Sequence, residues 1–216
     1  MNLWLHREVE VLYQLYNRNT NAVQVAHAMG IHAISYGLSK WKGILCSTCP
    51  LFTDKEYSFI PIGHLVKSGG MDSVFAFYQG LGPAYENALR EMLVFDAVIC
   101  NTDRHFGNFG FLVDNHTNQI ISPAPLFDHG NSLFNFAGAD CWNDEVVLDE
   151  YSSTLQPSVY DDFIGTARQY MTPELHQSLR HLLQFHFKKH SRYNLPDQRL
   201  KMPERQIQKR ARALLE

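Results

Sequence analysis

Apolar residues recur at helical spacing over residues 3–29. This spacing predicts a helix, because positions three or four apart share one helix face, and Gly30 is a natural stop after it. The polar run 17–21 is a candidate interruption of this helix, with Thr20 or Asn21 as the N-cap of a second helical segment.

The pattern then changes to short segments that suit β-structure. Residues 31–36 and 41–48 are predicted as the two strands of a hairpin, with 37–40 as its turn. Prolines at 50 and 61 predict irregular chain after the hairpin.

The strongest helix prediction covers residues 84–100, where Ala88, Met92, Phe95 and Ile99 form one apolar stripe. Further apolar residues widen the stripe, so this helix is expected to be mostly buried. A short amphipathic helix is predicted before it, and a second hairpin after it, with the turn-rich run 114–118 at its tip. These predicted elements are 72–79 for the helix and 109–113 with 119–122 for the hairpin strands; helices are also predicted at 159–171, 173–189 and 203–214.

The order helix, small sheet, helices, hairpin, helices predicts an α+β, helix-dominated fold. A chain of 216 residues with 45% hydrophobic residues can bury a sizeable core, which excludes a disordered protein. The net charge of −3 argues against a dedicated nucleic-acid binder. No apolar run approaches the roughly 20 residues of a membrane span. The opening residues do not resemble a signal peptide, and the four cysteines are expected as reduced thiols in the cytoplasm.

The densest polar run, residues 101–108, follows the predicted buried helix and precedes a predicted strand. It offers a carboxylate, a guanidinium, an imidazole and two carboxamides, so we interpret it as a functional loop on a rigid support. A simple polar turn is the alternative, but a turn does not need arginine and histidine as well.

Asp128 follows the returning strand of the second hairpin. Because a hairpin brings its two ends together, Asp128 is expected near Asp103 and Asn108. Carboxylate and carboxamide oxygens suit Mg²⁺ bound together with phosphate. An aspartate, an asparagine five residues later, a hairpin and a second aspartate are also the layout of kinases.

Residues 95–110, with the run N-x-D-R-H-x-x-N, and residues 124–133, with the run P-L-F-D-x-G-x-S-L, resemble the HipA-like serine/threonine kinases. These proteins are best known as toxins of bacterial toxin–antitoxin pairs. The resemblance implies a kinase C-lobe with a small N-terminal sheet. It implies residues 1–66 as an opening helix and β region leading to the segment between the lobes, and 67–216 as the helical lobe with the catalytic loop and the metal-binding hairpin.

The resemblance also implies ATP- and Mg²⁺-dependent phosphoryl transfer to a serine or threonine hydroxyl of a protein substrate. Its partners would be an antitoxin or a separate chain that supplies the N-lobe, with nucleic acid bound only through a partner and no membrane. Carried over by residue, Asp103 is the catalytic base, Asn108 and Asp128 hold Mg²⁺, Asn101 and His105 fix the loop, and Arg104 is either a structural partner of the loop or a phosphate contact.

Two further assignments come from the same resemblance. Glu8, with Glu10 as second choice, is the candidate glutamate that pairs with the kinase lysine. The backbone of Cys49, Pro50 and Leu51, continuing to Phe52, is the candidate contact to adenine.

The sequence departs from the kinase pattern in one respect. A glycine-rich phosphate loop and a strand lysine are expected before the glutamate-bearing helix, and the Gly69-Gly70 pair lies too late to supply that loop. A domain of a longer protein, an N-lobe from another chain and a degenerate kinase all fit, so little kinase activity is expected from these residues alone. The alternatives to a kinase are a pseudokinase that acts as a regulatory binding module, and a metal-dependent phosphohydrolase using Asp103, His105 and Asp128.

Overall fold

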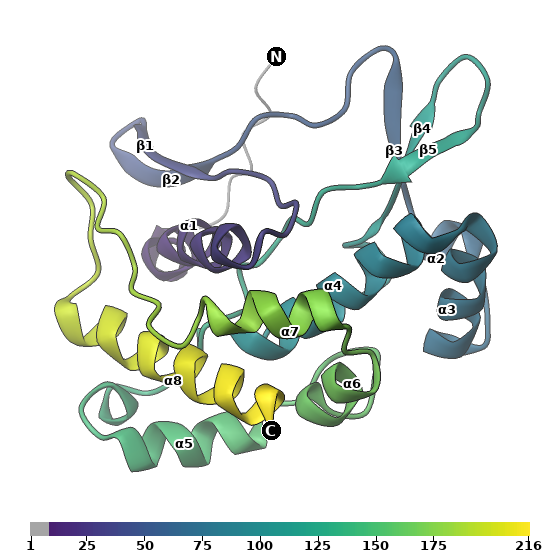
Figure 1. The fold of residues 1–216 in the computed structure, drawn as a ribbon. Helices are drawn as coiled ribbons and strands as arrows, with labels where there is room; N and C mark the ends of the chain where they lie inside the picture. The colour runs from purple at the N-terminus through teal and green to yellow at the C-terminus, as the bar shows by residue number, and fades with distance from the viewer. Residues whose placement is uncertain (1–8) are drawn as a thin grey trace.

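The computed structural model describes the backbone of residues 9–216 and the side chains of residues 19–216. It is a mixed, helix-rich structure with two small sheets (Figure 1). The elements in chain order are α1 (Val9–Met29), β1 (Gly37–Trp41), β2 (Ile44–Thr48), β3 (Tyr57–Pro61), α2 (Ile62–Leu65), α3 (Gly70–Leu81), α4 (Pro83–Ile99), β4 (Gly110–Asp114), β5 (Ile120–Pro123), the 3₁₀-helix η1 (Asp140–Trp142), α5 (Glu145–Thr154), α6 (Phe163–Gln169), α7 (Pro173–Arg180) and α8 (Asp197–Leu215).

Both sheets are antiparallel. Strands β1 and β2 form a hairpin that packs on α1, and β3, β4 and β5 form a second sheet in that order. In Figure 1 the sheets lie along one side of the molecule, and α5 to α8 lie on the opposite side with α4 between them. The predicted second hairpin is therefore present, and β3 adds a third strand to it.

Helix α4 is the centre of the core, as its apolar stripe predicts. Every side chain from Leu93 to Ile99 is essentially inaccessible to solvent. It packs against α3, α6 and α8, and it ends at Cys100, which adopts a left-handed conformation. Asp96 is buried with its apolar neighbours, so this carboxylate needs a partner inside the protein.

The first hairpin has a different register from the predicted one. Residues 37–40 form strand β1 and not a turn, and the turn is Lys42-Gly43, where both φ angles are positive. Two consecutive positive φ angles are typical of the tight turns that match strand twist. Residues 31–36 contribute only an isolated bridge between Ala33 and Leu126. Helix α1 runs without interruption through the polar run 17–21.

The segment expected to be irregular contains β3. Its last residue, Pro61, lacks an N–H, and proline is tolerated at such an edge position because β3 has a partner on one side only. Helix α5 was not predicted, and α6 is shorter than expected.

The C-terminal helices also have different boundaries. Helix α7 ends at Arg180, well before the predicted residue 189. Beyond it, Phe185 and Phe187 are both buried and their rings meet edge to face at 5.0 Å. Residues two apart point to opposite sides of a helix, so this contact requires a non-helical chain. Helix α8 begins at Asp197 and contains Pro203 in its interior, where a helix start was expected.

No helix in residues 9–216 is long and apolar enough to cross a membrane. One hydrophobic cluster includes residues from α1 through α8, among them Ala22 and Leu214. The boundary near residue 66 stays a prediction.

Candidate functional site

The predicted catalytic loop is anchored on a buried ion pair. The side chains of Asp96, on α4, and Arg104, in the loop, are both fully buried. Arg104 Nε donates to Asp96 Oδ2 at 2.8 Å and Arg104 Nη2 donates to Asp96 Oδ1 at 3.0 Å. Asn101 Nδ2 donates to the same Oδ1 at 3.0 Å. Three donors therefore satisfy the carboxylate that α4 carries into the core.

Arg104 also joins the loop to the chain that returns from the second hairpin. Its Nη1 donates to the backbone oxygens of Asn108, at 3.2 Å, and Phe127, at 2.9 Å. Burial lowers the pKa of Arg104, but the charge of the Asp96 carboxylate raises it by more, so the pKa of Arg104 lies above its ordinary value. One buried side chain thus brings Asn108 and the residue that precedes Asp128 to the same place. Of the two roles expected for Arg104, this position fits the structural one.

Asp103 lies at the surface of this framework and is partly exposed. Its N–H donates to Asn101 Oδ1 at 3.3 Å, and its backbone oxygen accepts a hydrogen bond from Asn108 Nδ2 at 3.2 Å. Its carboxylate oxygen Oδ2 accepts a hydrogen bond from Asn131 Nδ2 at 2.8 Å. The loop therefore holds the Asp103 backbone on one side, and Asn131 orients its carboxylate on the other.

Asn131 is a site residue that the sequence reasoning missed. Its backbone oxygen accepts hydrogen bonds from Thr102 N and Thr102 Oγ1, at 3.1 and 3.2 Å. The only sequence signal was its place inside the P-L-F-D-x-G-x-S-L run, at a position where the motif allows any residue.

Asp128 has an exposed side chain and a left-handed backbone, with a φ of 56°. Its N–H donates to the hydroxyl of Tyr36 at 3.1 Å. Burial raises the pKa of Tyr36, which keeps that hydroxyl neutral. Aspartate tolerates this conformation better than most residues, and strained backbone of this kind is common at functional sites.

His129, next to Asp128, is fully buried and lies behind the loop. Burial, assisted by the charge of Arg104, lowers the pKa of His129 well below its ordinary value, so the imidazole is neutral. Its Nδ1 lies 3.2 Å from Arg104 Nη2 and accepts a hydrogen bond from it. The backbone N–H of His129 donates to Asn19 Oδ1 at 2.8 Å, which connects the site to α1.

An aromatic cluster places the predicted adenine-binding segment beside the same site. The ring of Phe52 lies 5.3 Å from Phe127 and 5.8 Å from Phe59. Phe127 directly precedes Asp128, so the segment of Cys49, Pro50 and Leu51 runs close to the predicted metal ligand. Pro50 and Leu51 are exposed, and burial raises the pKa of the half-buried Cys49 thiol.

The remaining predicted residues are His105, which belongs to the loop itself, and two glutamates whose side chains are outside the description. His105 is exposed, and its Nδ1 accepts a hydrogen bond from Gly107 N at 3.0 Å, within its own loop. Glu8 lies outside the described residues, as does the side chain of Glu10.

The donor atoms near Asp103 fit a magnesium ion that also binds phosphate. Asn108 Nδ2 is occupied by Asp103 O, so its amide oxygen is the atom available to a metal, and the Asp128 side chain is exposed. Mg²⁺ commonly uses one or two protein oxygens and completes its shell with water and phosphate. Residues 19–216 contain no group of three or more histidine, cysteine, aspartate or glutamate side chains placed to hold a metal.

Comparison with known proteins supports the fold. The sequence matches no family model and no curated protein. Its structure is similar to a Helicobacter pylori proinflammatory kinase, CtkA, with a TM-score of 0.64 and 15% identity, covering 94% of this chain and 84% of that one. A more distant likeness, with a TM-score of 0.46 and 10% identity, is to Shewanella oneidensis MR-1 HipA, solved with HipB and operator DNA; it covers 95% of this chain and 56% of that one. The first likeness shows that this chain has a kinase-like fold.

Proposed function

We propose that this chain supplies the catalytic lobe for transfer of the γ-phosphoryl group of Mg²⁺-bound ATP to a serine or threonine hydroxyl of a protein. The observation that carries the proposal is the position of Arg104, whose guanidinium holds the backbone of both Asn108 and Phe127. Phosphoryl transfer requires a base and metal ligands close together, and these backbone contacts support such a grouping of Asp103, Asn108 and Asp128. The kinase-like fold supports this interpretation.

In this proposal Asp103 orients the acceptor hydroxyl and takes its proton. Asn131 holds Asp103 Oδ2, which leaves Oδ1 to face the acceptor. Asn108 and Asp128 would hold Mg²⁺, which when bound neutralises phosphate charge. The backbone of Cys49, Pro50 and Leu51 would contact adenine.

The motif resemblance also makes an antitoxin-like protein a proposed partner. This partner and the acceptor protein rest on the two motifs and not on a contact in the described residues.

Calorimetric titration with ATP and Mg²⁺ tests the metal site. Asp128 has an exposed side chain, so Asp128→Asn should leave the melting temperature unchanged. Losing one anionic ligand should weaken Mg²⁺–ATP binding by about tenfold, which corresponds to roughly 1.4 kcal/mol. Asp161→Asn is the control, because Asp161 is also exposed and is not a predicted site residue. Equal affinity of the wild type and Asp128→Asn would remove Asp128 from the metal site.

A further inference from the structure

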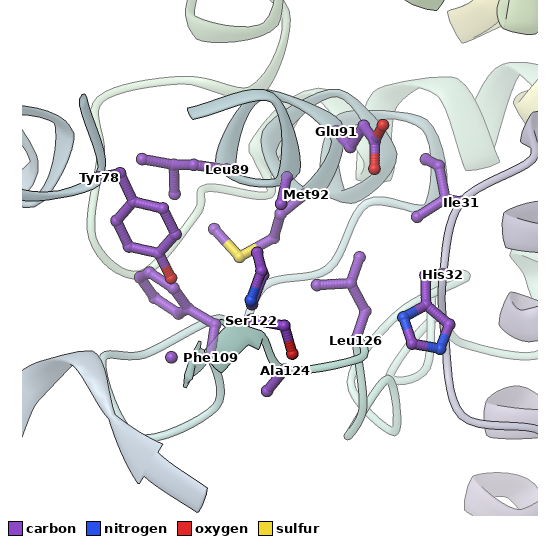
Figure 2. A pocket seen from close by; sticks show the side chains of 13 residues that line it. Ile31, His32, Tyr78, Leu89, Glu91, Met92, Phe109, Ser122, Ala124 and Leu126 are labelled. Carbon is purple, nitrogen blue, oxygen red and sulfur yellow. The ribbon is translucent and has the colours of Figure 1, made fainter. Parts of the chain in front are cut away.

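A cavity of about 290 Å³ lies between α4 and the segments that begin β4 and end β5 (Figure 2). We call it the α4 cavity. None of the predicted site residues lines it. Its lining residues are Ile31, His32, Tyr78, Ala88, Leu89, Glu91, Met92, Phe109, Gly110, Ser122, Pro123, Ala124 and Leu126.

The body of the α4 cavity is apolar. Leu89, Met92, Phe109 and Leu126 are buried residues that face it from three segments of the chain. A cavity of about 150 Å³ with such a lining accommodates benzene. The α4 cavity is about twice that size, so it suits an apolar ligand of about twelve non-hydrogen atoms.

Four polar side chains line the α4 cavity without a hydrogen bond to residues 19–216, namely those of His32, Tyr78, Glu91 and Ser122. Tyr78 is only 2% exposed, and Figure 2 shows its hydroxyl directed toward the side chains that surround the cavity. Glu91, on α4, is partly buried. Within residues 19–216 no hydrogen bond to the Tyr78 hydroxyl and no hydrogen bond or salt bridge to the Glu91 carboxylate is found. Burial raises the pKa of Glu91, as expected for a carboxylate that has no cation beside it.

We propose that the α4 cavity binds a small organic amine, with an apolar body of about ten carbon atoms and an ammonium group that pairs with Glu91. Its apolar part lies against Met92 and Leu126, and a polar atom at its far end reaches the Tyr78 hydroxyl. The charge of Glu91 selects the cation, because a neutral or acidic ligand of the same size would leave a partly buried carboxylate unpaired. This site does not depend on the kinase proposal.

Tryptamine, which has twelve non-hydrogen atoms, is the probe for this site. Tryptophol replaces its ammonium group by a hydroxyl at the same size, and indole-3-acetate carries a carboxylate in place of its aminomethyl group. Calorimetry at neutral pH should show tryptamine binding about five to ten times more tightly than tryptophol, with indole-3-acetate weakest. Glu91→Gln should remove the preference for tryptamine over tryptophol. Glu150→Gln, an exposed glutamate on α5, should keep it.

The position of the site is tested by Ala88→Leu. The larger side chain, added on the partly exposed side of α4, should fill part of the cavity and abolish tryptamine binding. Thermal melting of each variant checks that the fold is kept. Equal affinity for tryptamine and tryptophol, an unchanged preference in Glu91→Gln, or the absence of tryptamine binding at millimolar concentration would each overturn the proposal.

Discussion

Replacing Asp96 by asparagine perturbs the buried ion pair that holds the predicted catalytic loop. Asp96 accepts hydrogen bonds from three donors, two on Arg104 and one on Asn101. An asparagine of the same shape offers only one acceptor atom, and its NH₂ group would face a donor in either orientation. Arg104 would keep its charge and its bonds to two backbone oxygens, but no anion would remain in direct contact with it.

The size of the effect is set by burial. Both side chains are 0% exposed, and removing one partner of a buried ion pair costs about 3–5 kcal/mol. The two remaining carbonyl contacts favour the lower end, so we expect Asp96→Asn to lower the free energy of unfolding by about 3 kcal/mol. That is a large share of the roughly 5–15 kcal/mol that stabilises a typical domain.

Urea unfolding followed by circular dichroism measures this loss as a midpoint lowered by roughly 1–3 M. Glu145→Gln is the control, because its ion pair with Arg205 is exposed and should contribute less than about 1 kcal/mol. The double variant Asp96→Asn, Arg104→Gln should cost far less than the sum of the two single changes, since each single change breaks the same pair. A loss below about 1 kcal/mol, or additive losses, would refute the assignment of Arg104 as the anchor of the loop.

Three further outcomes are expected. Asn131→Ala should reduce kcat for phosphoryl transfer by about tenfold with little change in KM for ATP, because it frees Asp103 Oδ2 without touching the metal ligands; steady-state kinetics checks this. As the pH falls below about 6.5, His129 becomes protonated in the unfolded chain but not in the folded one, so the free energy of unfolding of the wild type should decline by up to about 1.4 kcal/mol per pH unit. Urea titrations at several pH values should show a shallower decline in His129→Gln. Gly110→Ala should destabilise the β3–β4 pairing severely, because a Cβ at this position would collide with the backbone of β3. Gly80→Ala, where no atom lies near the new Cβ, should raise the free energy of unfolding by about 0.5–1 kcal/mol, and thermal melts of both variants test this.

Part of the fold could be predicted because the local pattern and the tertiary structure agree. The stripe through Met92 and Ile99 predicts a buried α4, and the turn-formers at 114–118 predict the β4–β5 hairpin. The prediction that Asp128 returns toward Asp103 needed only the geometry of a hairpin. The contacts of Arg104 show how the two segments are joined.

Other elements depend on partners that are distant in sequence. Strand β3 pairs with β4, about fifty residues later. Tyr57, Phe59 and Ile60 suit a strand, but Pro61 at its end favoured irregular chain. The Lys42-Gly43 turn was missed because the glycine at 37 drew the prediction to the wrong position.

Within the site, the sequence named the residues but not their connections. Asp96 is the one charged residue in the apolar stretch 92–100, and its role is visible only from the position of Arg104 against it. Asn131 and Tyr36 lie far from the loop in sequence, so no local pattern could place them against Asp103 and Asp128.

The most direct test of the kinase proposal is phosphate incorporation from γ-labelled ATP into a mixture of protein substrates, followed by phosphoamino-acid analysis. The protein should be produced with any coding sequence that precedes Met1 retained, and compared with its Asp103→Asn and Asp161→Asn variants. We expect labelled phosphoserine or phosphothreonine from the wild type and from Asp161→Asn, and a loss of at least about a hundredfold in Asp103→Asn. Incorporation that is unchanged in Asp103→Asn, or no incorporation by the wild type, would contradict the proposal.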